Sequence, residues 1–518
     1  MSATGKEIIT VQFGSLPNHV GAHYFNLQNA NFSFNPDFPS DINHDVLFRE
    51  GTSEAGAFTY TPRLVVVDFE QSLHSLSKTG RNFVKAPQLE DVKRAVQSDE
   101  VEVLRSEPAP EKNEYHEDVA KQSEAADKED SMDVDVLLKT KYNLNPNSWS
   151  EVLTLDLHPR SLTTIPTQLT SGLELAKTTA AVGGQIWKSP SFADEFEDNV
   201  RFQLESCDIV QGFHVLTECE NMYAGMASAC LEYIRDECGK KSIITVPIFS
   251  LQDYEMNAIE GRKQLFTSLV NTALNFSRSN DLSDLVAPFS TRVNLWTDGA
   301  TFNNFNNLSF DGYSAYQSSS IMAAGLELFS TPYRLKRLLD VKMSNIVALL
   351  GLPGRKFVGG GVVFPFPERK IDYDILELLK RHKYSSLCPF VDLENTLDVQ
   401  AVTLKGFRHE MFPTSPALFV SPMNVRIPRT FPDIISSEHD VSNSALYYGR
   451  LREVTALSGL CNSREMKTLF ETLVGKLRAH NYHKLPGFIS NDLEAAELTD
   501  SLETLDDIGA SYDISMFL

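Results

Sequence analysis

Three short runs of apolar, largely β-branched residues constrain the fold of this chain more than any other feature of its sequence. They cover residues 63–69 (RLVVVDF), 209–216 (IVQGFHVL) and 243–249 (IITVPIF). Runs with so few polar residues are typical of strands in a parallel sheet that is covered on both faces. Amphipathic helical patterns at 192–206 and 222–237 alternate with these strands. The alternation predicts an α/β fold, a parallel sheet with helices on both faces.

Other patterns place further elements around this unit. Residues 7–13 (EIITVQF) are expected to form a strand, and the helix after it would carry Val20, Tyr24 and Leu27 on one face. We also expect a strand at 151–157, helices at 263–277 and 463–480, and a glycine-kinked strand within 354–367. Since the C-terminal third mixes helix and strand, a smaller α+β domain is expected to follow the parallel sheet.

A strongly acidic segment interrupts the chain. Between residues 90 and 135 there are 16 acidic and 6 basic residues, so the net charge is 6 − 16 = −10. Such a segment buries too little apolar area to offset the entropy of ordering, and a disordered insertion is expected. A solvated loop and a segment that binds a partner or is phosphorylated both fit this composition. The predicted division of the chain is 1–85 and 141–290 for the sheet domain, 86–140 for the acidic insertion, 291–490 for the second domain and 491–518 for a loose acidic tail.

Charge and cysteine content exclude several classes of function. The 518-residue chain has 47 Lys and Arg against 69 Asp and Glu, a net charge of −22. Direct binding of nucleic acid needs clustered cations and is therefore not expected. The six cysteines form no Cys-x-x-Cys pair, so we expect free thiols in a reducing compartment rather than a zinc site or a disulfide scaffold. No run of 18 uninterrupted apolar residues occurs, so no transmembrane segment is expected. The N-terminus has Lys6 and Glu7 but no arginine before Arg49, so neither a secretory signal nor a matrix-targeting helix is expected.

Three stretches, in the right order, are similar to tubulins. Residues 6–21 (KEIITVQFGSLPNHVG) resemble the tubulin start, a strand followed by QAGQCGNQIG. The residues on matching positions are Gln12, Gly14, Asn18 and Gly21. Residues 62–70 (PRLVVVDFE) resemble the tubulin strand PRAVLVDLE, and residues 205–213 (ESCDIVQGF) resemble ESCDCLQGF.

A Leu-His-Pro-Arg-Ser element at 157–161 makes the closer resemblance one to the misato family, tubulin-like proteins of eukaryotes. This resemblance implies a tubulin-like sheet domain. Fungal members are described as acting in the partitioning of mitochondria and the inheritance of mitochondrial DNA, so the resemblance implies a place on the cytosolic face of mitochondria and in the cytoplasm. An acidic chain is not expected to bind anionic lipid directly, and a protein receptor is then required.

The tubulin nucleotide site needs a glycine-rich GGGTGSG loop at a helix N-terminus, where backbone N–H groups hold the phosphates. The aligned residues here are 220–226 (ENMYAGM), with Gly225 as the one displaced glycine. Glu220 is expected to bring a negative charge to the place of a phosphate. Pro17 in the first loop has no N–H group to donate, although it also fits a plain helix start. We therefore expect no cofactor and no enzymatic activity.

Some residues keep the tubulin pattern and are the candidates for a vestigial nucleotide site. They are Gln12, Gly14, Ser15, Asp68, Glu70 and Gly225. Asp68 and Glu70 fall on the magnesium side of that site. A carboxylate pair at a strand end is common, however, and without phosphates it has little reason to bind Mg²⁺.

Other constellations carry weaker signals. Gly359–Gly361 precede a strand-like segment, so a bend in a strand is expected rather than a phosphate loop. His19 and His23 are spaced as helical metal ligands but lack an acidic partner between them, and no metal site is assigned. Arg160 fits an anion-binding role and a packing role equally. No nucleophile elbow is present, and no catalytic residue is assigned.

Three functions remain open at this stage. The first, which we favour, is a non-enzymatic tubulin-like protein that acts in mitochondrial inheritance through protein partners. The second is a residual GTPase that polymerises. The third is an assembly factor for tubulin or its folding machinery. The partners, on the mitochondrial surface or in the cytoskeletal machinery, are not identified by the sequence.

Overall fold

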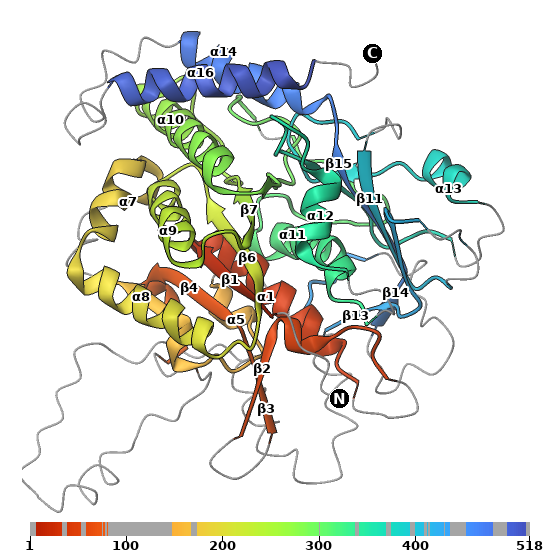
Figure 1. The fold of residues 1–518 in the computed structure, drawn as a ribbon. Coiled ribbons are helices and arrows are strands. Elements are labelled where there is room, and N and C mark those ends of the chain that lie inside the picture. The colour runs from red at the N-terminus through yellow and green to blue at the C-terminus, as the bar shows by residue number, and fades with distance from the viewer. Residues whose placement is uncertain are drawn as a thin grey trace, which may run out of the picture.

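The computed structural model describes residues 7–77, 80, 148–166, 174–336, 341–435, 452–479 and 495–513, apart from short gaps at 34–38, 53–57, 75, 300, 369–373, 394–398, 409–411, 413–414 and 429. The predicted acidic insertion at 86–140 lies outside the described residues. Two sheets carry the fold, with helices between and around them (Figure 1).

The first sheet has six strands, and every neighbouring pair is parallel. Their spatial order is β5 (Leu162–Ile165), β4 (Leu64–Phe69), β1 (Glu7–Phe13), β6 (Val210–Glu218), β7 (Ser242–Ile248) and β8 (Leu285–Val286). β1 lies in the middle of the sheet, and its residues are all buried because neighbouring strands and helices cover it on every side. The predicted parallel sheet is confirmed.

Helices cover both faces of this sheet. On one face, Ile9, Val11 and Phe213 belong to an apolar cluster with α8 (Pro190–Glu205) and α9 (Tyr223–Cys238). α7 (Ala180–Trp187) packs against α9. On the other face lie α1 (Ser15–Ala30) and α11 (Ala315–Ser330).

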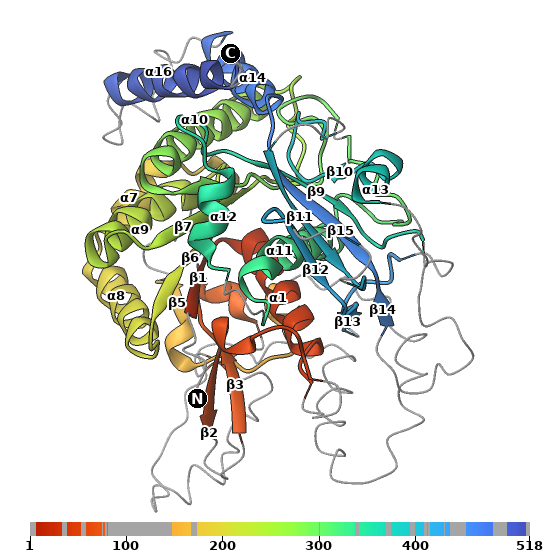
Figure 2. The same ribbon diagram turned by 45° about the vertical axis from the view of Figure 1, so that its right-hand side comes forward.

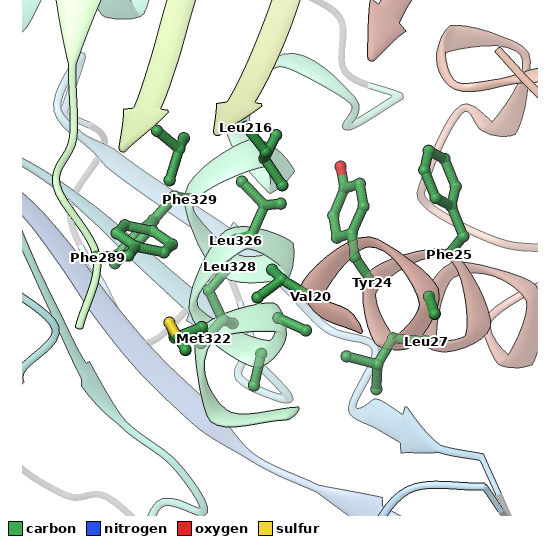
Figure 3. Packing of buried hydrophobic residues seen from close by; sticks show 14 of the residues in the cluster. Val20, Tyr24, Phe25, Leu27, Leu216, Phe289, Met322, Leu326, Leu328 and Phe329 are labelled. Carbon is green, nitrogen blue, oxygen red and sulfur yellow. The ribbon is translucent and has the colours of Figure 1, made fainter. Parts of the chain in front are cut away.

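α1 and α11 pack against each other, and buried apolar side chains lie between them (Figure 3). Val20 and Tyr24 of α1 lie toward α11, which contributes Met322, Leu326 and Leu328 to the same cluster. Because α1 is buried around almost its whole circumference, its polar side chains need internal partners. The Tyr24 hydroxyl, for example, lies 3.0 Å from the Ser330 hydroxyl.

The second sheet lies beyond α11 (Figure 2). Its spatial order is β10 (Ser385–Ser386), β9 (Gly359–Val363), β15 (Ala456–Asn462), β11 (Val399–Lys405) and β12 (Leu418–Ser421). Only β11 and β12 run parallel; the other neighbours are antiparallel. Residues of both sheets belong to one apolar cluster, so the domain boundaries proposed from the sequence stay a prediction.

The remaining elements complete the outer layers. α10 (Ile259–Leu282) contacts α14 (Met466–Ala479) and α16 (Ala495–Ser511) at one end of the molecule (Figure 1). The smaller elements are β2 (Phe48–Thr52), β3 (Phe58–Pro62), β13 (Val425–Ile427), β14 (Arg452–Val454), α5 (Trp149–Val152), α12 (Met343–Leu350), α13 (Ile375–Arg381), and the short 3₁₀ helices η1 (His44–Val46), η2 (Glu70–Leu73), η3 (Pro159–Ser161), η4 (Leu175–Lys177) and η5 (Thr331–Tyr333). Within the described part of the chain, no helix is long and apolar enough to cross a bilayer.

Two expectations about local structure are wrong. The strand expected at 151–157 is absent, because this region begins with the single helical turn α5 and the next strand, β5, starts only at Leu162. The end of the chain, expected to be a loose acidic tail, contains α16 instead. Its apolar residues recur every three or four positions and are buried against α10 and α14; they are Leu498, Leu502, Leu505 and Ile508, and Tyr512, directly after the helix, continues the pattern.

Candidate functional site

The candidate site lies at the carboxyl ends of β1, β4 and β6, where the chain turns from β1 into α1. Gly14 makes this turn with φ at +101°, a backbone conformation that residues with a Cβ rarely adopt. Parallel α/β sheets bind ligands at this edge, because strand ends and helix N-termini meet there. The backbone N–H groups of the first turn of α1 point toward it, and such groups attract anions.

The residues that carry the tubulin resemblance have structural roles at this turn. Gln12 lies against Gly21, where a Cβ would come within 2.0 Å of the glutamine Nε2. Asn18 donates from Nδ2 to Asp68 Oδ2 at 3.0 Å. Ser15 opens α1, and its carbonyl oxygen lies 2.9 Å from His19 Nδ1. Pro17 sits within the first turn of α1, so it tolerates the lack of an N–H group there.

A glutamate of the chain itself contacts the N-terminus of α1. The Leu16 backbone N–H donates to Glu218 Oε1 at 2.9 Å, and Asn221 Nδ2 donates to Glu218 Oε2. A Cβ on Gly14 would lie 2.7 Å from Glu218 Cδ, so the carboxyl group rests directly on the glycine turn. Glu218 therefore fills the place that an external anion would take at this helix end.

Asp68 is held beside this turn by four donors. Asn18 Nδ2 and Trp149 Nε1 donate to Oδ2, the latter at 2.9 Å. The Phe69 N–H and the Tyr223 hydroxyl donate to Oδ1, at 2.8 and 3.2 Å. With both oxygens used by protein groups, Asp68 serves as a structural acceptor in this arrangement.

No cation balances these carboxylates in the described part of the chain, where no lysine, arginine or histidine forms an ion pair with Asp68 or Glu218. Burial raises the pKa of Glu218 to about 7, against the lowering effect of its bonds from Leu16 and Asn221. Asp68 and Glu220 add repulsion that raises it further. Burial likewise raises the pKa of Asp68. The electrostatics of the site therefore oppose added negative charge.

The prediction for Glu220 is wrong in its detail. Its carboxylate does not contact α1 but accepts hydrogen bonds on the side of β7 and α10. The donors are the Ser250 N–H at 2.7 Å, the Ser268 hydroxyl at 2.6 Å, the Tyr254 hydroxyl at 3.0 Å and Trp296 Nε1 at 3.1 Å. Glu218, two residues earlier, is the acid that contacts the N-terminus of α1.

The backbone N–H groups at the start of α9 are also hydrogen-bonded to side chains of the protein. The Met222 N–H donates to the Thr178 hydroxyl at 3.0 Å, and the Tyr223 N–H donates to Asn221 Oδ1 at 3.0 Å. Gly225 lies inside α9, where a Cβ would come within 1.9 Å of the Ala180 carbonyl oxygen of α7. Gly183 of α7 approaches the Met222 carbonyl oxygen equally closely. These two glycines allow α7 and α9 to cross, and the structure places Gly225 in this crossing rather than at a phosphate.

The remaining candidate residues lie apart from this turn or have structural partners. Glu70 is exposed at the start of η2. His19 and His23 direct nitrogens to different carbonyl oxygens, those of Ser15 and Tyr316, and burial lowers their pKa values to about 4 and about 3. No group of acidic, histidine and cysteine side chains among the described residues is arranged to hold a metal ion.

The Leu-His-Pro-Arg-Ser element forms the turn before β5 and packs against α8. His158 accepts the Arg160 N–H at its Nδ1 and stacks on Phe202 with ring centroids 4.3 Å apart. The Arg160 side chain is exposed and lies 4.0 Å from Asp198. Gly359–Gly361 lie within β9, as expected for a bend-prone strand. A packing role accounts for both motifs.

The arrangement does not fit a guanine nucleotide. The N–H groups at the starts of α1 and α9 that would face its phosphates are already bonded to Glu218, Thr178 and Asn221. A phosphate would also have to enter beside two carboxylates. Glu218 is the residue that sequence reasoning missed, and it is the residue on which this mismatch mainly depends.

Comparison with known proteins gives matches over most of the chain. A family model described as "Misato Segment II tubulin-like domain" matches residues 6–121, and one described as "Tubulin domain" matches residues 144–335. The chain is 29% identical to "Protein misato" of Drosophila melanogaster over 78% of this chain and 73% of that protein. It is 25% identical to "Protein misato homolog 1" of Bos taurus over 99% of both chains. It is 27% identical to "Protein DML1" of Phaeosphaeria nodorum over 64% of this chain and 59% of that protein.

Proposed function

Because the chain belongs to the misato family of tubulin-like proteins, we propose that it acts in the distribution of mitochondria and the inheritance of mitochondrial DNA. It does so through protein–protein contacts and without binding or hydrolysing GTP. The mitochondrial role is the one that the family resemblance implies. The protein then works at the cytosolic face of mitochondria and in the cytoplasm.

The observation that carries the non-enzymatic part is the contact between Glu218 and the N-terminus of α1. The Leu16 N–H that would meet a phosphate donates instead to the glutamate, 2.9 Å away. A nucleotide phosphate would have to displace this carboxylate and then remain close to it and to Asp68. Two like unit charges 4 Å apart repel by about 4 kcal/mol at an effective dielectric constant near 20. No lysine or arginine in the described residues forms an ion pair with either acid to offset this cost.

The charge of the chain supports a protein rather than a membrane partner. A net charge of −22 is repelled by the anionic cytosolic leaflet, whereas a basic protein surface would attract it. We therefore propose a protein receptor or a cytoskeletal protein as the direct partner.

Calorimetric titration of the purified, nucleotide-stripped chain with GTP and Mg²⁺ tests the loss of nucleotide binding. We expect no heat of binding up to high micromolar GTP. Micromolar binding that Glu70→Ala weakens would contradict the proposal and favour a polymerising GTPase. In cells lacking the protein, wild type and Glu70→Ala should restore the mitochondrial distribution equally. A folded Glu70→Ala protein that fails to restore it would point to a retained magnesium-nucleotide site.

A further inference from the structure

We propose that Glu218 is a built-in anionic ligand: its carboxylate occupies the anion-binding end of α1 and by this autoinhibitory contact keeps phosphate groups out. The inference rests on the proposed absence of nucleotide binding and names its main cause. It implies that the anion-binding backbone turn is still formed in this chain, and that a small residue at position 218 uncovers it. The ligand class that would then bind is an inorganic oxyanion such as phosphate or pyrophosphate.

The geometry of the turn is that of a cradle for an oxyanion. Gly14 has the positive φ and the missing Cβ that let a ligand atom approach the backbone, and Glu218 Cδ, Oε1 and Cγ all lie within 3.0 Å of the Cβ position that glycine lacks. The Leu16 N–H points at the carboxylate, and Asn221 binds its second oxygen. A helix N-terminus with a glycine turn binds phosphate by the same two means, N–H groups and close backbone approach.

Polar atoms beside the cradle have hydrogen-bonding capacity to spare. Gln12 Nε2 and Asn18 Oδ1 are buried, and neither has a hydrogen-bond partner among the described residues. The Asn18 N–H donates to the Gly14 carbonyl oxygen at 3.1 Å, which places Asn18 beside the cradle, whereas the Gln12 amide lies against Gly21, farther along α1. Unpaired buried polar atoms are rare in folded proteins and often mark a place where a water or a ligand binds. Asn18 Oδ1 is therefore a second feature of this place, independent of the helix end, that suits a polar ligand.

Glu218, the residue that fills the cradle, is an acid in surroundings that favour an uncharged side chain. Glu218 has two acidic neighbours, Asp68 and Glu220, and forms no ion pair with a cation among the described residues, so its placement is electrostatically unfavourable apart from the dipoles that it contacts. A carboxylate on this helix end resembles a bound oxyanion in charge and in its use of N–H donors. The contact therefore has the properties of a tethered ligand.

Three proteins test the inference: wild type, Glu218→Ala and Glu218→Gln. Each would be titrated with sodium pyrophosphate in the absence of metal ions and followed by calorimetry and by phosphorus NMR. We expect saturable binding by Glu218→Ala at least tenfold tighter than any binding by wild type. Glu218→Gln is the matched control, because it removes the charge but still fills the cradle, and it should bind no better than wild type.

The outcomes separate this inference from the proposed function. If wild type binds GTP, the proposed function fails. If wild type does not bind GTP and Glu218→Ala, folded by circular dichroism, gains no pyrophosphate binding, the built-in-ligand inference fails alone. Equal binding by Glu218→Ala and Glu218→Gln would also overturn it, because the gain would then come from charge and not from an opened cradle.

A double-mutant cycle tests the contact without any added ligand, in case Glu218→Ala folds poorly with anions present. Gly14→Ala should lower the melting temperature by several degrees more in wild type than in Glu218→Ala. The backbone strain at Gly14 is common to both backgrounds, whereas the collision with the carboxyl group exists only in the first. Equal losses in the two backgrounds would show that the carboxyl group does not rest on this turn.

Discussion

Two glutamates in this molecule are placed under opposite electrostatic conditions. Glu218, at the carboxyl edge of the first sheet, accepts a backbone N–H and a side-chain amide and has acids as its charged neighbours. Glu327 of α11, between the two sheets, is 1% exposed and lies 2.7 Å from Arg334 and 2.8 Å from Lys405. Burial raises the pKa of Glu218 to about 7, whereas at Glu327 the two cations outweigh burial and hold the pKa below its usual value.

The difference shows that the kind of partner, more than enclosure, decides the charge of a buried acid. N–H dipoles and an amide are too weak to keep Glu218 fully ionised at neutral pH, while two full cations keep Glu327 ionised. The second region also carries a surplus positive charge, since Arg334 and Lys405 share one acid. Burial first, and then the positive charge of Arg334, lowers the pKa values of His44 and His214 to about 3. A substitution at each acid should therefore have effects of different size and sign.

The largest effect is expected at the paired acid. Glu327→Gln leaves Arg334 and Lys405 buried without an anion, and an uncompensated buried charge costs about 3–5 kcal/mol. Chemical denaturation at pH 7 would measure this loss in the free energy of unfolding. A loss below about 1 kcal/mol would mean that water reaches the ion pairs of Glu327. It would contradict the view that buried cations set Glu327 apart from Glu218.

A smaller effect, of opposite sign, is expected at the unpaired acid. Because the folded-state pKa of Glu218 is raised from 4.5 to about 7, the folded protein binds a proton that the unfolded chain releases, so this group makes stability fall as the pH rises from about 4.5 to about 7. Glu218→Gln removes that fall. Allowing for solvent screening of a half-buried side chain, we expect about 2 kcal/mol less loss than in wild type.

Unfolding free energies of wild type and Glu218→Gln at pH 5, 6, 7 and 8 would measure this difference. Parallel curves for the two proteins would contradict the raised pKa. Glu205→Gln is a suitable control, because Glu205 ends α8 and its side chain is exposed, so its curve should follow that of wild type.

The smallest loss of stability is expected when one of the two cations beside Glu327 is removed. Lys405→Met leaves Glu327 paired with Arg334 and removes the extra buried cation, so the loss should be about 1 kcal/mol. The same denaturation experiment would measure it beside Glu327→Gln. If Lys405→Met cost as much as Glu327→Gln, the two cations would be needed jointly, and the surplus charge would have another partner.

Much of the first sheet could be predicted because its strands carry the information locally. The runs at 63–69, 209–216 and 243–249 are apolar on both sides of the strand, and only a strand covered on both faces explains them. The strand expected at 151–157 failed because a few apolar residues also suit a helical turn. There Trp149, in α5, donates to Asp68, a contact 81 residues apart in the chain that no local pattern contains.

The site could be predicted only in outline, and the reason is a strand end misplaced by two residues. The sequence suggested that the strand after 209 ends at Leu216, whereas β6 runs on to Glu218. Side chains two apart in a strand point to the same face. Since Leu216 packs in the cluster that contains α1, Glu218 turns toward α1 as well, and Glu220 lies beyond the strand. A correct strand end was the signal that would have found Glu218.

The order of strands in the second sheet has a consequence for the synthesis of the protein. β15 (Ala456–Asn462) is the last of its strands to leave the ribosome, yet it lies between β9 and β11, which are made earlier. Until then, β9 and β11 each have an unpaired edge on the side that β15 will take, and unpaired edges invite pairing with other chains. A premature stop codon after β12 (Leu418–Ser421) and before β15 would therefore leave a protein with an open sheet, a substrate for chaperones and proteases rather than a shortened working molecule.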